Sequence, residues 1–159
     1  MADLDEQMIN RAIDLGRSGA ESGSGGPFGA VVVIAGVVVG EAHNAVIATG
    51  DPTAHAEVQA IRAAAQQVGS PHLVGAVLYT SCEPCPMCAG AAMWARVDRV
   101  VYASSREDAR QWGRYDDDDF WDDLVRPVPE RHLAHTQLGQ AEALEVWKWF
   151  AQHAGALNY

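Results

Sequence analysis

The chain has few cysteines, and they are not spread along it. All three lie within the stretch 80–88, which reads TSCEPCPMC. Clustered cysteines without partners elsewhere in the chain cannot form the disulfide framework of a small secreted domain. The cysteine pattern therefore excludes that class of protein and favours a reducing, cytoplasmic compartment.

Long apolar runs are also missing. A transmembrane helix needs about 20 consecutive, mostly apolar residues, and no run in this chain reaches that length. The first residues, MADLDE, are acidic, whereas a secretory signal peptide begins with a positively charged region. We therefore expect no membrane segment and no targeting peptide.

Basic residues are scarce. The 159 residues include 11 Lys and Arg against 21 Asp and Glu, so the formal net charge is −10. Such a surface repels phosphate backbones unless a basic patch is segregated. Five arginines within 96–114 could form such a patch or pair with nearby acids, but six acids within 116–123 oppose a backbone close by. The charge pattern thus favours a partner other than nucleic acid.

Internal repeats and long linkers are absent from the sequence, and 159 residues are enough for one domain with its own core. We expect a single domain over 1–159. A glycine- and serine-rich loop is predicted over 16–29 and a further loop over 127–136. Apolar periodicity predicts helices over 5–18, 54–68, 87–95 and 140–153, and strands over 30–34, 37–41, 74–81 and 99–104. This order indicates an α/β sheet layered by helices.

The cysteine stretch has a counterpart about 30 residues earlier, where His55 and Glu57 stand in the sequence THAE. Cys85 and Cys88 are spaced to direct two sulfurs at one ion, and His55 can add a nitrogen ligand. Three protein ligands leave a fourth tetrahedral position for water, which is typical of catalytic zinc. Glu57 is then interpreted as the proton carrier beside the metal-bound water.

Cys-x-x-Cys alone has two other interpretations, a structural zinc knuckle and a redox pair. A structural zinc knuckle needs a fourth ligand, and the chain has no second Cys-x-x-Cys. A redox pair would need neither His55 nor Glu57. Cys82 is interpreted as a small buried residue. The combination of His-x-Glu with Pro-Cys-x-x-Cys matches the known signature of zinc deaminases.

On these residues the chain resembles the cytidine-deaminase-like superfamily, and within it the bacterial guanine deaminases. The resemblance covers nearly the whole chain and includes the segments 25–30, 43–44, 51–57, 79–88 and 115–117, together with the terminal Tyr159. It implies a three-layer α/β fold, with a central mixed sheet of about five strands flanked by helices. It also implies one Zn²⁺ per chain with a catalytic water.

The resemblance further implies which residues contact the substrate. Phe28 would line the base pocket and Asn44 would bind a ring edge, although a core phenylalanine and a turn asparagine are the alternatives. A carboxylate can accept from the N–H edge of guanine, which points to Asp117, with Asp118 as the neighbouring choice. The residues implied as substrate-binding are Phe28, Asn44, Ala56, Asp117 and Tyr159.

The sequence therefore predicts hydrolytic deamination of free guanine to xanthine and ammonia. Deamination of another small amino-heterocycle or nucleoside, deamination of tRNA adenosine and a structural zinc module are the alternatives. We expect a purine base as the partner, neither nucleic acid nor membrane, and a homodimer. In that dimer the C-terminal segment could complete the partner's site.

Overall fold

The computed structural model describes residues 2–115 and 118–153. The chain forms two compact units, Met1–Asp118 and Asp119–Tyr159. The predicted single domain over 1–159 stays a prediction.

The first unit is built around one sheet with strand order β2-β1-β3-β4. β1 pairs antiparallel with both β2 and β3, whereas β3 pairs parallel with β4, so the sheet is mixed. The β1–β2 hairpin closes at Ala35 and Gly36, which both have positive φ (49° and 81°), as a tight hairpin turn requires. The strands span Gly29–Ile34 (β1), Val37–His43 (β2), Ala76–Cys82 (β3) and Arg99–Ser104 (β4).

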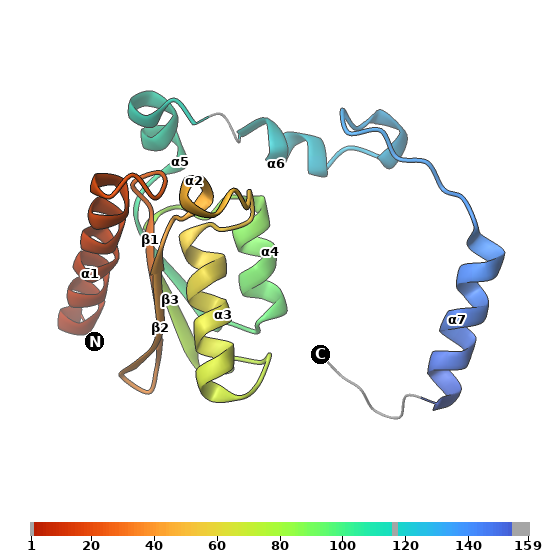
Figure 1. Cartoon of the computed structure of the whole chain (residues 1–159), viewed down its shortest axis with the longest axis horizontal. Helices are drawn as coiled ribbons and strands as arrows, with labels where there is room; N and C mark the ends of the chain where they lie inside the picture. Colours follow the sequence, from red (N-terminus) through yellow and green to blue (C-terminus); the bar gives the residue numbers. More distant parts are fainter. Residues whose placement is uncertain (1, 116–117, 154–159) are drawn as a thin grey trace. The chain divides into compact units, whose positions relative to one another are not determined.

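Helices cover both faces of this sheet (Figure 1). α1 (Ala2–Glu21) lies on one face, where Ala12 packs with alternate side chains of β1 and β3, including Val31 and Tyr79. On the opposite face lie α3 (Ala56–Val68) and α4 (Pro86–Trp94), which bury the other row of strand side chains in a second cluster. The three-layer α/β architecture expected from the sequence is confirmed.

α1 is longer than predicted. It runs to Glu21, through residues whose glycines and serines suggested a loop. A Cβ on Gly16 would lie 2.7 Å from the carbonyl oxygen of Pro27, and one on Gly19 would lie 2.7 Å from the His43 ring. These glycines therefore serve close packing of the helix against neighbouring chain segments, and the prediction of a loop from residue 16 was wrong.

Four strands form the sheet in the part of the chain that the structure describes, one fewer than the resemblance implied. The described residues after β4 add no further strand to this sheet. Asp118–Leu124, which overlaps the acidic run of 116–123, is helical. The remaining elements are α2 (Val46–Thr49), α5 (Arg106–Asp108), the π-helix η1 (Ala109–Gly113), α6 (Asp118–Leu124), the 3₁₀-helix η2 (Val128–Glu130) and α7 (Gln140–His153).

None of the helices in residues 2–115 and 118–153 combines the length and the apolar character needed to cross a membrane.

A polar contact ties α1 to the sheet. Asp5 accepts hydrogen bonds from the buried Tyr79 hydroxyl at 2.5 Å and from the Arg99 guanidinium at 2.6 and 3.0 Å. The hydrogen bonds from Arg99 and Tyr79 lower the pKa of Asp5 below its usual value. Because the folded-state pKa is lowered, this contact stabilises the fold above the unfolded-state pKa and is lost as pH falls through the folded-state pKa.

Asp5→Asn should therefore lower the melting temperature at pH 7, and the difference from wild type should shrink as the pH falls below about 4. Asp3→Asn is the matched control, because Asp3 is an exposed acid in the same first helical turn. Melting curves from pH 7 to pH 3 measure both. An equal loss of stability in Asp3→Asn would show that the effect comes from removing a negative charge at the start of α1, and not from the contact of Asp5 with Tyr79 and Arg99.

Candidate metal and active site

The two ligand-bearing stretches both lie at helix starts. His55 is the N-cap residue of α3 and Cys85 is the N-cap residue of α4. Before α3, the Asp51 carboxylate accepts from the backbone N–H and hydroxyl of Thr53 at 2.8 and 2.7 Å. Pro86 occupies the first turn of α4, where its fixed φ suits the helix and its missing N–H costs nothing. Both positive helix ends therefore face the same small region.

His55, Cys85 and Cys88 come together from these two helices. The Nδ1 atom of His55 lies 3.6 Å from the Cys85 sulfur and 3.5 Å from the Cys88 sulfur. The three ligand atoms lie within 4.8 Å of one another. A tetrahedral zinc with about 2.3 Å bonds to sulfur and about 2.0–2.1 Å to nitrogen needs a sulfur–nitrogen separation of about 3.6 Å. The donor set therefore fits zinc in both chemistry and spacing.

The pKa values of the Cys85 and Cys88 thiols are shifted in opposite directions. A hydrogen bond with Cys88 is the main cause that lowers the pKa of Cys85, to about 4, with a further contribution from His55. The same hydrogen bond and burial raise the pKa of the Cys88 thiol. Cys85 is thus held as a thiolate, which is the form of cysteine that binds metal.

Glu57 lies beside this group, in the first turn of α3, and only 6% of its surface is exposed. Burial is the main cause that raises the pKa of its carboxyl above the usual value. Its Oε1 accepts from the Thr80 hydroxyl at 3.3 Å, and its Oε2 accepts from the Cys88 thiol at 3.5 Å. A buried carboxyl with a raised pKa holds a proton more readily than an exposed one, which suits a group that carries protons.

Three of the residues predicted to bind substrate lie in the described part of the chain. Asn44 is buried, and its side-chain oxygen accepts from the backbone N–H of Val46 at 3.2 Å. The backbone N–H of Asn44 donates to the backbone carbonyl of Phe28 at 2.9 Å, so the two residues are joined through their main chains. Ala56 is fully buried at the start of α3. The other two, Asp117 and Tyr159, lie outside the described residues.

Tyr115 has no role among the residues predicted from the sequence. Its ring packs edge-on against Phe28, with ring centroids 4.9 Å apart. A Cβ on Gly26 would lie 2.2 Å from the Tyr115 hydroxyl, so the absence of a side chain at Gly26 permits this contact. Tyr115 comes from a distant part of the chain, after the turn at Arg114, and only its place in a motif beside Asp117 could have drawn attention to it.

A second close approach concerns Gly25 and Asn44. A Cβ on Gly25 would lie 2.0 Å from the Asn44 side-chain oxygen and 2.9 Å from its backbone oxygen. Gly25→Ala should therefore displace Asn44. The KM for guanine, the substrate predicted from the sequence, should rise about tenfold, equivalent to ~1.4 kcal/mol. Steady-state kinetics measure this. Gly90→Ala is the control, because nothing lies within 4 Å of a Cβ at Gly90 in α4; an equal KM in both variants would contradict the prediction.

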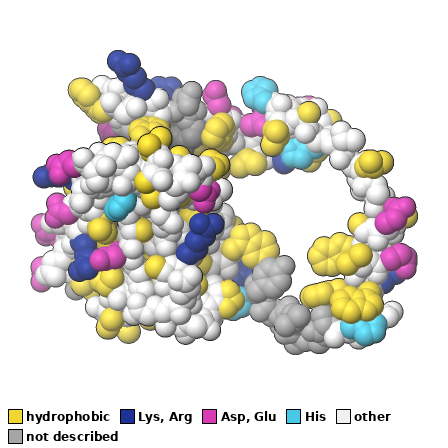
Figure 2. Space-filling view, in the orientation of Figure 1, with side chains coloured by type: hydrophobic (Ala, Val, Ile, Leu, Met, Phe, Trp, Pro, Cys, Tyr) yellow, Lys and Arg dark blue, Asp and Glu magenta, His cyan; other side chains and the backbone are white. Residues whose placement is uncertain are grey.

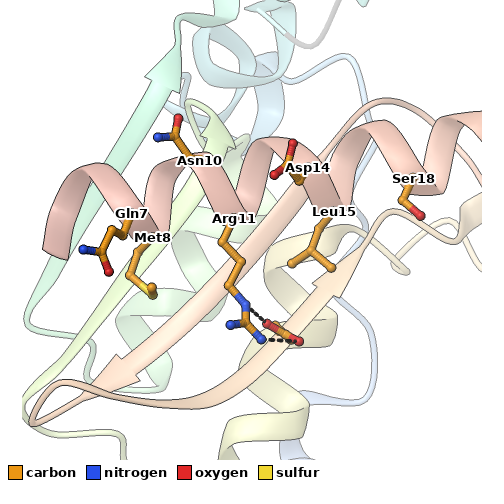
Figure 3. A pocket seen from close by; sticks show the side chains of 8 residues that line it. Gln7, Met8, Asn10, Arg11, Asp14, Leu15 and Ser18 are labelled. Atoms are coloured by element: carbon orange, nitrogen blue, oxygen red, sulfur yellow. Dashed lines mark hydrogen bonds and ion pairs between the residues drawn. The ribbon is translucent and has the colours of Figure 1, made fainter. Parts of the chain in front are cut away.

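A separate groove lies on the other side of the sheet, between α1 and β2 (Figure 3). Within it Arg11 and Glu41 form a two-pronged ion pair. The groove is lined by Gln7, Met8, Asn10, Arg11, Asp14, Leu15, Ser18 and Glu41. None of these residues belongs to the His55–Cys85–Cys88 group, which lies at the helix starts on the opposite face.

Comparison with known proteins shows which family this chain belongs to. Residues 2–104 match the cytidine and deoxycytidylate deaminase zinc-binding region. The chain belongs to the cytidine and deoxycytidylate deaminase family. The resemblance inferred from the motifs is therefore confirmed, and the metal held by this deaminase domain is zinc.

Members of the family differ in how far they resemble this deaminase. Guanine deaminase from Bacillus subtilis is 44% identical over 149 residues, covering 92% of this chain and 95% of that protein. The X-ray structure of guanine deaminase from Bacillus subtilis superposes with a TM-score of 0.91 at 42% identity, covering 97% of this chain and 98% of the other. A tRNA-specific adenosine deaminase from Haemophilus influenzae is 40% identical over 105 residues, covering 65% of this chain and 60% of its own length.

Proposed function

We propose that the protein hydrolytically deaminates guanine to xanthine and ammonia. It is then a hydrolase acting on a C–N bond of a cyclic amidine. The observation that carries the proposal is the His55–Cys85–Cys88 group beside the buried Glu57. This group lies in a chain whose similarity to a guanine deaminase extends over 92% of its length.

His55, Cys85 and Cys88 would hold the zinc ion, which would act as a Lewis acid and make a water molecule available as a nucleophile near neutral pH. The chain's own contribution to the proton transfers is Glu57. Its carboxylate takes a proton from the attacking water and gives it to the ring nitrogen next to the amine-bearing carbon. Once the water oxygen has bonded to that carbon, the carboxylate takes the remaining proton from this oxygen and delivers it to the departing amino group. A C=O bond then forms as the C–N bond breaks and ammonia leaves. Burial keeps bulk water from competing for these protons.

The proposed substrate pocket uses the binding residues that the family resemblance implies. The Phe28 ring offers a flat apolar face for a purine, and Tyr115 supports it edge-on. The Asn44 side chain can donate to a ring acceptor, since its oxygen already accepts from Val46. The backbone N–H of Ala56 is at a helix start, where N–H groups have no intrahelical partner. Asp117 and Tyr159 complete the proposed set.

Charge argues against a tRNA substrate. The net charge of −10 repels phosphate. Among the arginines of 96–114, Arg99 pairs with Asp5, and Arg110 pairs with Glu107 at 3.1 Å. These two side chains are therefore partly neutralised by the protein's own acids.

Ammonia release from a panel of substrates tests the proposal. Zinc-loaded protein is offered guanine, adenine, cytosine, their nucleosides and a tRNA under identical conditions. Guanine should give the highest kcat/KM. Faster release from cytosine, a nucleoside or tRNA would overturn the choice of substrate, and no release from any of them would favour a structural zinc module.

We further propose that the protein is a cytoplasmic homodimer in which the C-terminal segment completes the partner's site. Taken by itself, the second unit has no core, because none of the side chains described in 119–153 is buried. α7 carries large apolar side chains on its surface beside acidic ones (Figure 2), with Trp147 68% exposed. Exposed apolar side chains of this kind mark an interaction surface. In the proposed dimer, a second copy of the chain covers them.

Light scattering should give twice the mass of one chain. Mixing two inactive variants then tests the shared site: Glu57→Gln with its tail intact, and a chain that lacks residues 154–159. If the tail acts across the dimer, random mixing should restore about a quarter of wild-type activity, since half of the dimers are mixed and each has one complete site. No recovery would assign the tail to its own chain's site.

A further inference from the structure

Thr80 stands out on the face of the sheet that packs against α3. Alternate residues of β3 point to this face, and the two that precede Thr80, Ala76 and Leu78, are fully buried in its apolar cluster. Thr80 pairs with Ala30 of β1 and with Tyr102 of β4, so it lies in the middle of the sheet. Its exposed fraction is 0%. Packing alone would therefore suit an aliphatic side chain here.

The Thr80 hydroxyl has a specific polar partner. It donates to Oε1 of Glu57 at 3.3 Å, from a strand to a helix 23 residues away in sequence. A buried hydroxyl costs free energy unless it is hydrogen-bonded. Valine has nearly the same shape and would fill the position without that cost. The hydroxyl is thus explained by its contact with the carboxyl and not by packing.

We propose that Thr80 is a positioning residue for the deamination reaction. Its O–H holds one oxygen of Glu57 in a fixed place, so that the carboxyl keeps one rotamer beside the metal group through successive proton transfers. Proton transfer needs the carboxyl within hydrogen-bond reach of the donor and acceptor, and a misplacement of about 1 Å can cost about 10²-fold in rate. This inference rests on the function proposed above.

Thr80→Val and Thr80→Ser form the matched test. Thr80→Val removes the hydroxyl and keeps the shape, and we expect kcat for guanine to fall about 10- to 100-fold while KM changes less than about twofold. Thr80→Ser keeps the hydroxyl, and kcat should stay within about threefold of wild type. Bound zinc and melting temperature are measured for both variants. Full kcat in Thr80→Val, or an equal loss in Thr80→Ser, would overturn the proposal.

A structural measurement separates this inference from the proposed function. Crystal structures of the zinc-loaded wild type and Thr80→Val are compared at the Glu57 side chain. The carboxyl should leave its wild-type position in Thr80→Val, whichever amino-heterocycle proves to be the substrate. If guanine is not deaminated, the proposed function fails while this comparison still decides the role of Thr80. An unchanged Glu57 rotamer in Thr80→Val would overturn that role.

Discussion

Glu57→Gln should lower the rate of ammonia release by at least about 10²- to 10⁴-fold, the range typical of losing a general acid–base group. Glutamine keeps the size and hydrogen-bonding shape of the side chain but cannot carry a proton between water and the leaving group. Zinc should remain bound, because Glu57 is not among the three residues grouped as ligands. Initial rates and zinc content of the same preparation measure both expectations.

Glu41→Gln is the control for this variant. Glu41 pairs with Arg11 on the α1 side of the sheet, away from the metal group, and its replacement should leave turnover unchanged. Normal turnover by Glu57→Gln would show that the proton carrier is another residue. Loss of zinc together with turnover would show instead that Glu57 acts on the metal site.

The second large effect concerns the metal ligands. Cys88→Ser should abolish deamination and weaken zinc binding by more than about 100-fold. Residues that only support metal ligands already account for about 10- to 100-fold in metal affinity, and a serine hydroxyl is a poor substitute for a thiolate. The fully buried position of Cys88 in α4 leaves little room for water to replace the lost sulfur. Competition with a chromogenic chelator measures the affinity.

Cys82 provides the control for the cysteine variant. It lies in the same stretch, is also buried and forms no disulfide. Its thiol donates to the Ser105 carbonyl at 3.6 Å and is not part of the His55–Cys85–Cys88 group. Cys82→Ser should keep both zinc and activity. If Cys82→Ser lost zinc as Cys88→Ser does, the assignment of ligands would be wrong.

Much of the fold could be predicted from local pattern. The β1–β2 hairpin, β4 and α7 match the predicted ranges closely, because alternation, turn residues and helical periodicity are local signals. The start of the predicted 16–29 loop was wrong because Gly16 and Gly19 are explained by contacts with Pro27 and His43. Such contacts depend on tertiary packing, which glycine content alone does not reveal.

The candidate site also combines residues that could be predicted from the sequence with contacts that could not. His55, Glu57 and the two ligand cysteines could be predicted because the spacing of a metal motif is strict and local. The edge-on packing of Tyr115 on Phe28 and the hydrogen bond from Thr80 to Glu57 join residues that are far apart in sequence. Their relation follows from the strand register and the turn after η1, neither of which has a distinct sequence signature.

The central claim is that one zinc ion, held by His55, Cys85 and Cys88, is required for guanine deamination. The most direct test is to remove the metal with a chelator and return zinc stepwise, measuring bound zinc and ammonia release from guanine in each sample. The account predicts that activity rises in proportion to bound zinc and stops rising at one ion per chain. Full activity in the zinc-free protein would contradict it.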